Sequence, residues 1–450
     1  MVSALTLDPL FSDQAVLPRD VPIPVYGRAV PGQTIKVTFA SQQVSARADS
    51  KGTWVTLLPP MPAGGPFTLS VSMAGRQLIR RDIHVGEVWL AVGGANMDMP
   101  LAETTDARVA LAQATLPKLR LFTVPNRLAA ATPIDARWER CTAAKAATFS
   151  AVGFYFARML HETLECPVGV ILATAPQAKA MAWLPADATR GSSEIAMLAR
   201  AGSLDPASAP GAVFSSMIAP LTRFLIRGVI AWQGESDLDA PDGYAPVFRE
   251  QIKSWRAAWR RDDLPFIFVQ LGGHLTPRTE PGDDPWAELR EAQARALQLP
   301  ATAMAVAADI GDAESITPRA KRAIAERLML SSLAVAYGRS MPHSGPVYAG
   351  HQVRDGAIHL RFHHAESGLR GTRTGPLLSF AIAGADRNFR WGDARIENDT
   401  VIVRHPAISQ PVAVRYAWES CPTLTLENGA GLPAAPFRTD TWPALVPARR

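Results

Sequence analysis

The stretch GEVWLAVGGANMDMP, residues 86–100, decides how the rest of the sequence is interpreted. A run of apolar residues leads into two glycines, Gly93 and Gly94, and then into a segment that can begin a helix. Many hydrolases carry their nucleophile on such a strand–turn–helix elbow. Here Ala95 stands at the tip of the turn, and its methyl group cannot attack a carbonyl carbon.

The composition is that of a globular protein. A chain of 450 residues with 47% hydrophobic and 19% charged residues predicts two or three domains with ample core. The net charge of +5 is spread along the chain, and no basic run is interleaved with aromatic residues, so we expect no nucleic-acid partner. Apolar stretches such as PVGVILATAP are shorter than the roughly 20 residues of a membrane span, so none is predicted.

Cysteine usage and the N-terminus bear on cofactors and location. Cys141, Cys166 and Cys421 are too few and too scattered for a disulfide framework or a zinc site, and we expect neither metal nor cofactor. The first 20 residues lack a basic segment followed by an apolar core, which predicts no signal peptide in this chain. The location stays open: cytoplasmic by default, periplasmic or secreted if a signal was removed.

The hydrophobic pattern changes twice along the chain. Residues 1–85 alternate at period two between turn signals, which predicts an N-terminal β domain. Residues 86–340 alternate apolar strands with amphipathic helices, which predicts an α/β domain with a parallel sheet covered by helices on both faces. Residues 341–450 return to short strands and predict a C-terminal β domain. Both β segments are expected to be sandwich-like, and whether they pack together stays open.

Individual elements follow from the same pattern. The clearest outer strands are TIKVTF (34–39), TWVTLL (53–58) and AIHLRF (357–362). The core strands are expected in GEVWLAVGG, PVGVILATA, IRGVIAW, PFIFVQLGG and MAVAADIG. Helices are expected over residues 144–164, 244–260 and 318–338.

Three motifs of the α/β segment belong together: GGANMDMP (93–100), WQGESD (232–237) and DIGDAESITP (309–318). With LFSDQAVLPRD (10–20) and FAIAGADRNFRWGDARI (380–396), they make the chain resemble the sialate O-acetylesterase family of SGNH hydrolases, which remove acetyl esters from sugars. The resemblance implies a three-layer, flavodoxin-like α/β/α core. It also implies an acetylated sugar or oligosaccharide as the ligand.

The resemblance places the catalytic positions on residues that cannot perform the family's reaction. The family's nucleophile lies in a G-Q-S-N-M turn, whose serine position is Ala95 and whose glutamine position is Gly94. Its Asp-x-x-His motif corresponds to Glu314 at the acid position and Thr317 at the base position. Acyl transfer by this route needs both the serine and the histidine. We therefore predict a degenerate, hydrolytically inactive member of the family.

The remaining site positions are candidates for ligand binding. The resemblance makes Gln233 a side-chain donor to an oxyanion, and it groups Gly94 with the polar positions Asn96, Asp98 and Glu235. A second donor is expected in the turn that contains Pro176, which has no N–H to offer.

Other residues near these motifs have plainer interpretations. Glu235 and Asp237 are expected to brace loops, and Ser315 to bond the local backbone. His161 is expected to be packed in a helix, and His274 to lie in a loop after a strand.

Three functions stay open at this point. The protein can be a carbohydrate-binding pseudoenzyme, or a scaffold for a protein partner. The alternative is a carbohydrate O-acetylesterase with an altered catalytic site.

Overall fold

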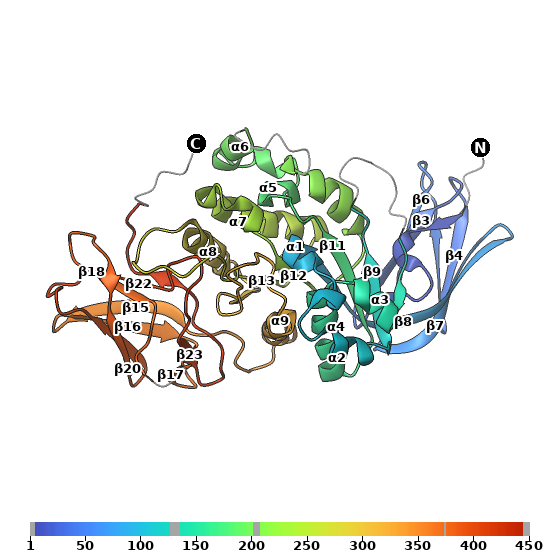
Figure 1. The fold of residues 1–450 in the computed structure, drawn as a ribbon. Coiled ribbons are helices and arrows are strands. Elements are labelled where there is room, and N and C mark those ends of the chain that lie inside the picture. The colour runs from blue at the N-terminus through green and yellow to red at the C-terminus, as the bar shows by residue number, and fades with distance from the viewer. Residues whose placement is uncertain (1–4, 127–135, 201–207, 373–374, 444–450) are drawn as a thin grey trace.

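An 11-stranded sheet organises the chain from its N-terminal region to residue 305. The computed structural model describes residues 5–126, 136–200, 208–372 and 375–443. A region of mixed helices and strands lies in the middle, with β regions at its two opposite ends (Figure 1). Over the residues just given, the two terminal β regions therefore do not pack on each other.

Strand β8, Arg76–Gly93, joins the N-terminal β region to the α/β region without a break. Its first half pairs antiparallel with β7 (Gly64–Met73), whereas its second half runs parallel to β11 (Val168–Thr174) and β12 (Gly228–Trp232). From Ile83 onward every residue of β8 is buried, because elements cover both faces of the sheet there. Since β8 crosses residue 85, the division into domains at 1–85, 86–340 and 341–450 stays a prediction.

The centre of the sheet is parallel, in the order β9-β11-β8-β12-β13-β14. The remaining bounds are Leu116–Thr123 for β9, Phe266–Val269 for β13 and Thr302–Ala305 for β14. The five core strands expected from the sequence thus pair in parallel, whereas the sheet as a whole is mixed. The β7–β8 hairpin continues the same sheet into the N-terminal region, and β10 (Glu139–Cys141) adds an antiparallel edge strand beside β9.

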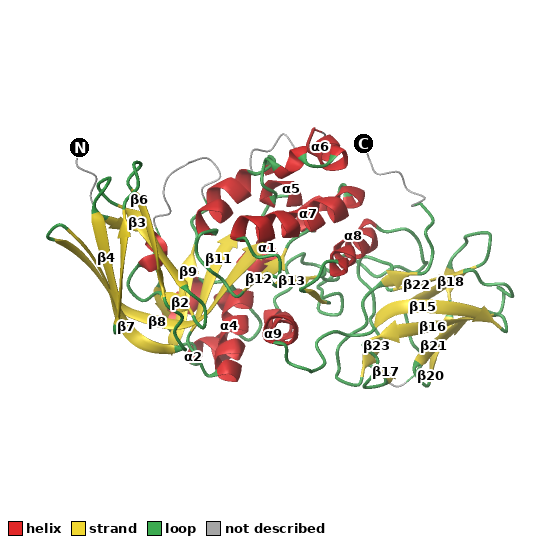
Figure 2. Cartoon of the chain, turned by 180° about the vertical axis from the view of Figure 1, so that it is seen from behind, coloured by secondary structure: helices red, strands yellow, loops and turns green. Residues whose placement is uncertain are grey.

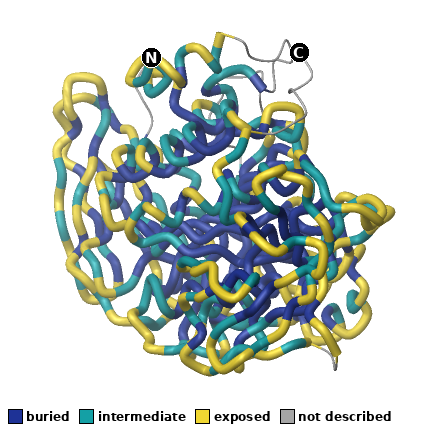
Figure 3. The backbone as a smooth tube through the Cα atoms, turned by 90° about the vertical axis from the view of Figure 1, so that its left-hand side faces the viewer, coloured by how far each residue is buried: buried dark blue, intermediate teal, exposed yellow. Residues whose placement is uncertain are grey.

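Helices pack against the sheet through alternating side chains of the strands. Trp89 and Ala91 of β8 share one apolar cluster with α4 (Ala151–Leu164) and α9 (Lys321–Tyr337). Leu90 and Val92 of the same strand belong to a second cluster, together with α7 (Pro241–Trp259) and α8 (Pro285–Ala294). Figure 3 shows the buried backbone concentrated in the middle of the molecule. The α/β class is thus confirmed, whereas the SGNH description stays a prediction.

The helix expected over residues 144–164 is divided. Helix α3 (Ala143–Thr148) ends before Phe149, and α4 begins after Ser150. The Ser150 hydroxyl accepts a hydrogen bond from Gly153 N at 3.0 Å, so it caps the new helix. The shorter helices are α1 (Ala95–Asp98), α2 (Ala107–Ala112), α5 (Ala180–Trp183) and α6 (Ser193–Arg200).

The N-terminal β region contains two layers of strands with a shared core. One small sheet is formed by β1 (Thr6–Leu7), β3 (Ile23–Arg28) and β6 (Thr53–Leu58). Strands β4 (Thr34–Phe39) and β5 (Gln42–Arg47) belong to the large sheet, as does β2 (Val16–Pro18). Trp54 of the first sheet and Phe39 of the second lie in the same buried cluster. The sequence-derived strands 34–39 and 53–58 coincide with β4 and β6.

The C-terminal β region consists of three small sheets, seen from behind in Figure 2. The first contains β15 (Val347–Arg354), β16 (Ala357–His363), β21 (Thr400–Arg404) and β20 (Asp393–Glu397). The second contains β19 (Arg390–Trp391), β18 (Phe380–Ala383), β22 (Ala413–Tyr416) and β24 (Phe437–Arg438). Strands β17 (Leu369–Gly371) and β23 (Leu426–Asn428) form the third.

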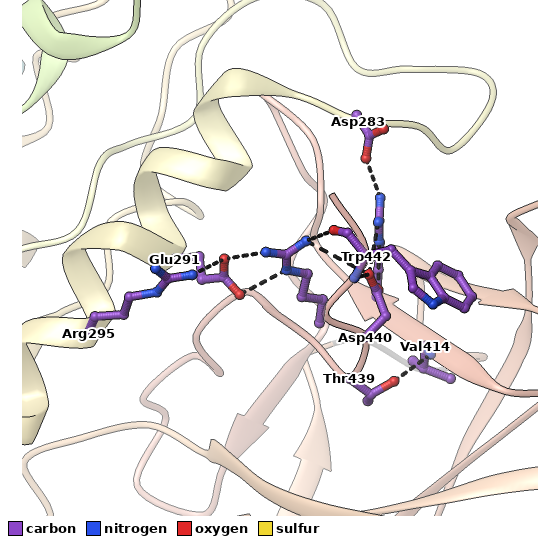
Figure 4. A network of polar contacts seen from close by, with 9 residues as sticks. Asp283, Glu291, Arg295, Val414, Thr439, Asp440 and Trp442 are labelled. Carbon is purple, nitrogen blue, oxygen red and sulfur yellow. Dashed lines mark hydrogen bonds and ion pairs between the residues drawn. The ribbon is translucent and has the colours of Figure 1, made fainter. Parts of the chain in front are cut away.

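Buried and half-buried ion pairs fasten the C-terminal β region to the α/β region (Figure 4). Arg415 of β22 donates hydrogen bonds to Asp283 at 2.6 Å and to Asp440 at 2.9 Å. Arg438 of β24 reaches Glu291 of α8, with both bonds at 2.9 Å. These contacts join strands near the C-terminus to the helix and loop that follow β13.

Candidate functional site

The glycine turn at the end of β8 forms an elbow, which we define as residues 93–98. Gly93 lies so close to β12 that a Cβ atom on it would stand 1.9 Å from the Trp232 carbonyl oxygen, so only glycine fits. Gly94 N donates to the same oxygen at 2.9 Å. Helix α1 starts at the next residue, and Ala95 is partly exposed at its tip. The nucleophile position is therefore reachable from solvent and carries a methyl group.

Asn96 connects the elbow to the other two motifs. It is 2% exposed, and its Nδ2 donates to Glu235 Oε1 at 2.6 Å and to the Ile316 carbonyl at 2.9 Å. Its Oδ1 accepts a hydrogen bond from Nζ of Lys321. The side chain thus holds the loop that carries Thr317 against α1. We call Asn96, Glu235 and Lys321 the amide cluster.

Burial shifts the pKa values of the two ionisable groups of the amide cluster, Lys321 and Glu235. The Lys321 side chain is fully buried, with Nζ 4.3 Å from the centre of the Trp232 ring. Desolvation lowers the pKa of Lys321 to about 7, and the nearby Glu235 only partly opposes this. Desolvation also raises the pKa of Glu235, against the hydrogen bond from Asn96 and the charge of Lys321. For both groups the cost of burying the charged form exceeds the attraction between them.

The loop at the acid and base positions is held by its own hydroxyls. Thr317 Oγ1 lies 3.3 Å from Ser315 Oγ, and Thr317 N donates to that oxygen at 3.2 Å. Glu314 is exposed, and its N–H donates to Asp312 Oδ1 at 2.9 Å. The structure therefore places the Thr317 position next to the elbow through Ile316, whereas the carboxylate of Glu314 faces solvent.

Asp98 forms the exposed rim of the elbow. Its Oδ1 accepts a hydrogen bond from Thr174 Oγ1 at 2.5 Å. Thr174 is the last residue of β11 and pairs in register with Gly93. A hydroxyl and a carboxylate are thereby held together beside the nucleophile position.

The Gln233 side chain is hydrogen-bonded to a residue of α7 and not to the elbow. Its Nε2 donates to Gln251 Oε1 of α7 at 2.9 Å, and Gln251 Nε2 donates back at 3.3 Å. Both side chains are buried. The role of Gln233 as an oxyanion donor stays a prediction, and it would require this amide to exchange Gln251 for a ligand.

Two further loops lie beside the elbow. A Cβ atom on Gly94 would lie 3.4 Å from the Pro176 carbonyl oxygen, so the turn after β11 is adjacent to the elbow. Both carboxylate oxygens of Asp237 accept from Ala180 N at 3.1 Å. Desolvation raises the pKa of Asp237 to about 7. Asp237 therefore ties the WQGESD loop to α5.

The two histidines singled out from the sequence form contacts with backbone carbonyl oxygens. His274 Nδ1 contacts the Asp312 carbonyl at 3.1 Å, and His161 Nδ1 contacts the Cys166 carbonyl at 2.6 Å. Within the described ranges, no histidine ring shares a hydrogen bond with a serine or threonine hydroxyl. No histidine in this part of the chain is thus positioned as a base for a hydroxyl nucleophile.

The described residues contain neither a candidate metal site nor a candidate membrane span. Of the side chains that the structure describes, no three His, Cys, Asp or Glu groups come together in a way that could bind a metal ion. None of the described helices combines the length and apolar character needed to cross a bilayer.

Sequence reasoning did not identify Lys321, Thr174 or Gln251 as site residues. Lys321 lies three residues after Pro318 at the start of a helix, where a lysine is normally solvated. Thr174 ends an apolar strand, and only the pairing of β11 with β8 brings it to Asp98. Their roles depend on contacts between distant parts of the chain.

Comparisons with known proteins identify the family of this chain. The sequence model of the family described as "Carbohydrate esterase, sialic acid-specific acetylesterase" matches residues 85–333. Sialate O-acetylesterases of Mus musculus and Homo sapiens are both 27% identical to 92% of this chain, over 90% and 88% of their own lengths. The crystal structure of a carbohydrate acetylesterase from Xanthomonas citri superposes with a TM-score of 0.91. It is 38% identical and covers 97% of this chain and 100% of its own.

Proposed function

Because this chain belongs to the sialic acid-specific acetylesterase family of carbohydrate esterases, we propose that its elbow binds acetylated sugars without hydrolysing them. The proposal is supported by the Asn96 side chain, which donates hydrogen bonds to both Glu235 and the Ile316 carbonyl and so holds the three motifs together. The scaffold that brings the three motifs together is intact. The reactive atoms expected on it are replaced by the Ala95 methyl and the Thr317 hydroxyl.

Magnitudes favour binding over turnover. Removing the serine or the histidine of such a triad costs about 10⁶-fold in kcat, and removing both costs little more, because the groups act as a unit. In an enzyme whose other catalytic groups are in place, the loss of one oxyanion donor raises the activation free energy by roughly 3–4 kcal/mol. Pro176 has no N–H and the Gln233 amide is bonded to Gln251, so both expected donors are compromised. Ligand binding needs none of these reactive groups.

Calorimetry with an acetylated methyl glycoside tests the proposal. We expect saturable binding to the wild-type protein and its loss in Ala95→Trp, because the indole would fill the partly exposed tip of the elbow. Ala112→Trp, at an exposed position of α2, is the matched control and should bind normally. Co-purification with another protein, together with no sugar binding, would instead indicate a scaffold.

Hydrolysis is measured in parallel with an aryl acetate. We expect the wild-type protein and Gln233→Ala to release phenol at the same rate, since neither forms an acyl-enzyme. A faster wild-type rate would show that the elbow still stabilises an oxyanion.

One observation favours a second candidate, an acetylesterase with an altered site. Thr174 Oγ1 donates to Asp98 Oδ1 at 2.5 Å beside the elbow, so a carboxylate is held on a hydroxyl that could be a nucleophile. This candidate predicts that the wild-type protein hydrolyses the aryl acetate and that Thr174→Val does not. Equal rates for the two proteins would exclude Thr174 as the nucleophile.

The proposal extends to the architecture. We propose the SGNH, flavodoxin-like description for the α/β region, with α4 and α9 on one face of the parallel strands and α7 on the other. In this description the elbow lies at the carboxyl end of β8, where open α/β sheets bind ligands.

A further inference from the structure

A cavity lies where the loop after β13 meets the C-terminal β region. It is lined by residues 281–283 from the loop, by Arg387, Asn388, Phe389 and Arg415, and by Trp442 and Pro443. None of these residues belongs to the elbow or the amide cluster. The cavity therefore has no part in the function proposed above.

Two aromatic rings form its apolar walls. The centres of the Phe389 and Trp442 rings are 5.8 Å apart, with their planes inclined at 60°. Figure 4 shows the Trp442 ring beside the ion pairs that fasten the C-terminal β region. Rigid aromatic rings with polar neighbours are typical of small-ligand sites, because they offer contact area at a low cost in conformational entropy.

The polar groups of the cavity are held in place. The Arg415 guanidinium bonds to Asp283 at 2.6 Å and to Asp440 at 2.9 Å, and it lies 4.2 Å from the centre of the Phe389 ring. Arg387 is exposed, with its guanidinium 5.3 Å from the centre of the Trp442 ring. Donors and acceptors thus stand beside the rings, and the carboxylates balance the fixed positive charge. Such a mixture suits a neutral ligand rich in hydroxyl groups.

The size of the cavity limits the ligand. Its volume is about 120 Å³. One water needs about 10–15 Å³ on the same measure, so the space holds about 8–12 atoms of that size. This matches one pyranose ring with its hydroxyls and is too small for several rings.

We infer that this cavity is a second sugar-binding site that takes one neutral pyranose ring against Trp442 and Phe389. The inference rests on the proposed function in one respect, the choice of a sugar as the ligand. A protein that binds acetylated sugars encounters glycans with further, unacetylated rings. It needs no acetyl group and no residue of the elbow.

Saturation-transfer NMR with methyl β-D-glucopyranoside tests the inference on the full chain. We expect saturable transfer to the glycoside and a loss of affinity of about tenfold or more in Trp442→Ala, because the ring supplies the contact area. Trp442→Phe is the matched variant, which keeps an aromatic face and should stay within about threefold of the wild type. The melting temperature of each variant establishes that it is folded.

The elbow variant Ala95→Trp separates this inference from the proposed function. It should abolish binding of the acetylated glycoside at the elbow and leave binding of methyl β-D-glucopyranoside unchanged. Loss of the unacetylated glycoside in Ala95→Trp would overturn the inference, and so would undiminished binding in Trp442→Ala. No saturable transfer from the wild-type protein would overturn it as well, whatever the outcome at the elbow.

Discussion

Lys321 donates a hydrogen bond to Asn96 Oδ1 across the 225 residues that separate them in the sequence. The same Asn96 side chain donates to Glu235 and to the Ile316 carbonyl, so a single amide joins three loops. A fully satisfied buried amide fixes the relative positions of the segments that it contacts. The elbow is therefore preorganised although its nucleophile position is an alanine.

Asn96→Ala should lower the free energy of unfolding by about 2–4 kcal/mol, because it removes a buried amide that bonds to Glu235, to the Ile316 carbonyl and to the buried ammonium of Lys321. Urea denaturation measures this. Gln352→Ala, at an exposed position of β15, is the control and should change stability by less than about 0.5 kcal/mol. Equal stabilities would show that the amide cluster does not hold the loops.

Lys321→Met should change how stability depends on pH. The pKa of Lys321 is lowered from 10.5 to about 7 in the folded protein, so between these values the unfolded chain binds more protons. Stability therefore rises with pH across this window, and it rises faster than in the variant, which does not titrate there. The stability of the wild type relative to the variant should therefore increase by about 1 kcal/mol per pH unit between pH 7 and pH 10.5. Parallel pH profiles in chemical denaturation would contradict the placement of the buried ammonium.

Arg415→Leu should weaken the attachment of the C-terminal β region. It leaves the buried carboxylates of Asp283 and Asp440 without their shared guanidinium, which we expect to cost about 3–5 kcal/mol in thermal unfolding. Arg395→Leu removes an exposed partner of Glu397 and is the matched control, with an expected cost below about 1 kcal/mol. Similar losses in both variants would mean that the ion pairs in Figure 4 do not join the two regions.

Restoring the catalytic side chains should recover only part of an esterase's activity. Ala95→Ser combined with Thr317→His should raise kcat/KM for an aryl acetate but leave it at least about a hundredfold below that of an intact site, because Pro176 offers no N–H to an oxyanion. Adding Pro176→Gly should raise it by about a hundredfold more, the usual value of one such donor. If the double variant alone became an efficient esterase, the loss of the donor would be irrelevant.

Much of the fold followed from the sequence because local patterns encode it. Strands β4 and β6 coincide with the segments of alternating residues, and α9 lies within the expected helix. The continuity of β8 could not be foreseen, since its change from antiparallel to parallel neighbours is a property of the assembled sheet. The break at Ser150 lies inside a helical pattern. It is explained by the cap to Gly153 and by the β-bridge between Ser150 and Pro100, a contact between distant parts of the chain.

The site was predicted unevenly for the same reason. The motifs placed Ala95, Asn96 and Glu235 in one region, and the structure brings these elements together. The engagement of Gln233 by Gln251 and the burial of Lys321 arise from packing between elements far apart in sequence. No periodicity or motif within one segment contains that information.

Mass spectrometry of the intact protein during incubation with an aryl acetate distinguishes an elbow that only binds from one that forms an acyl-enzyme. We expect no hydroxylamine-labile acetyl group on the chain, because the elbow presents a methyl group where an ester would have to form. An acetyl ester that appears during turnover and maps to one of the hydroxyls near the elbow, those of Thr174, Ser315 and Thr317, would contradict this expectation.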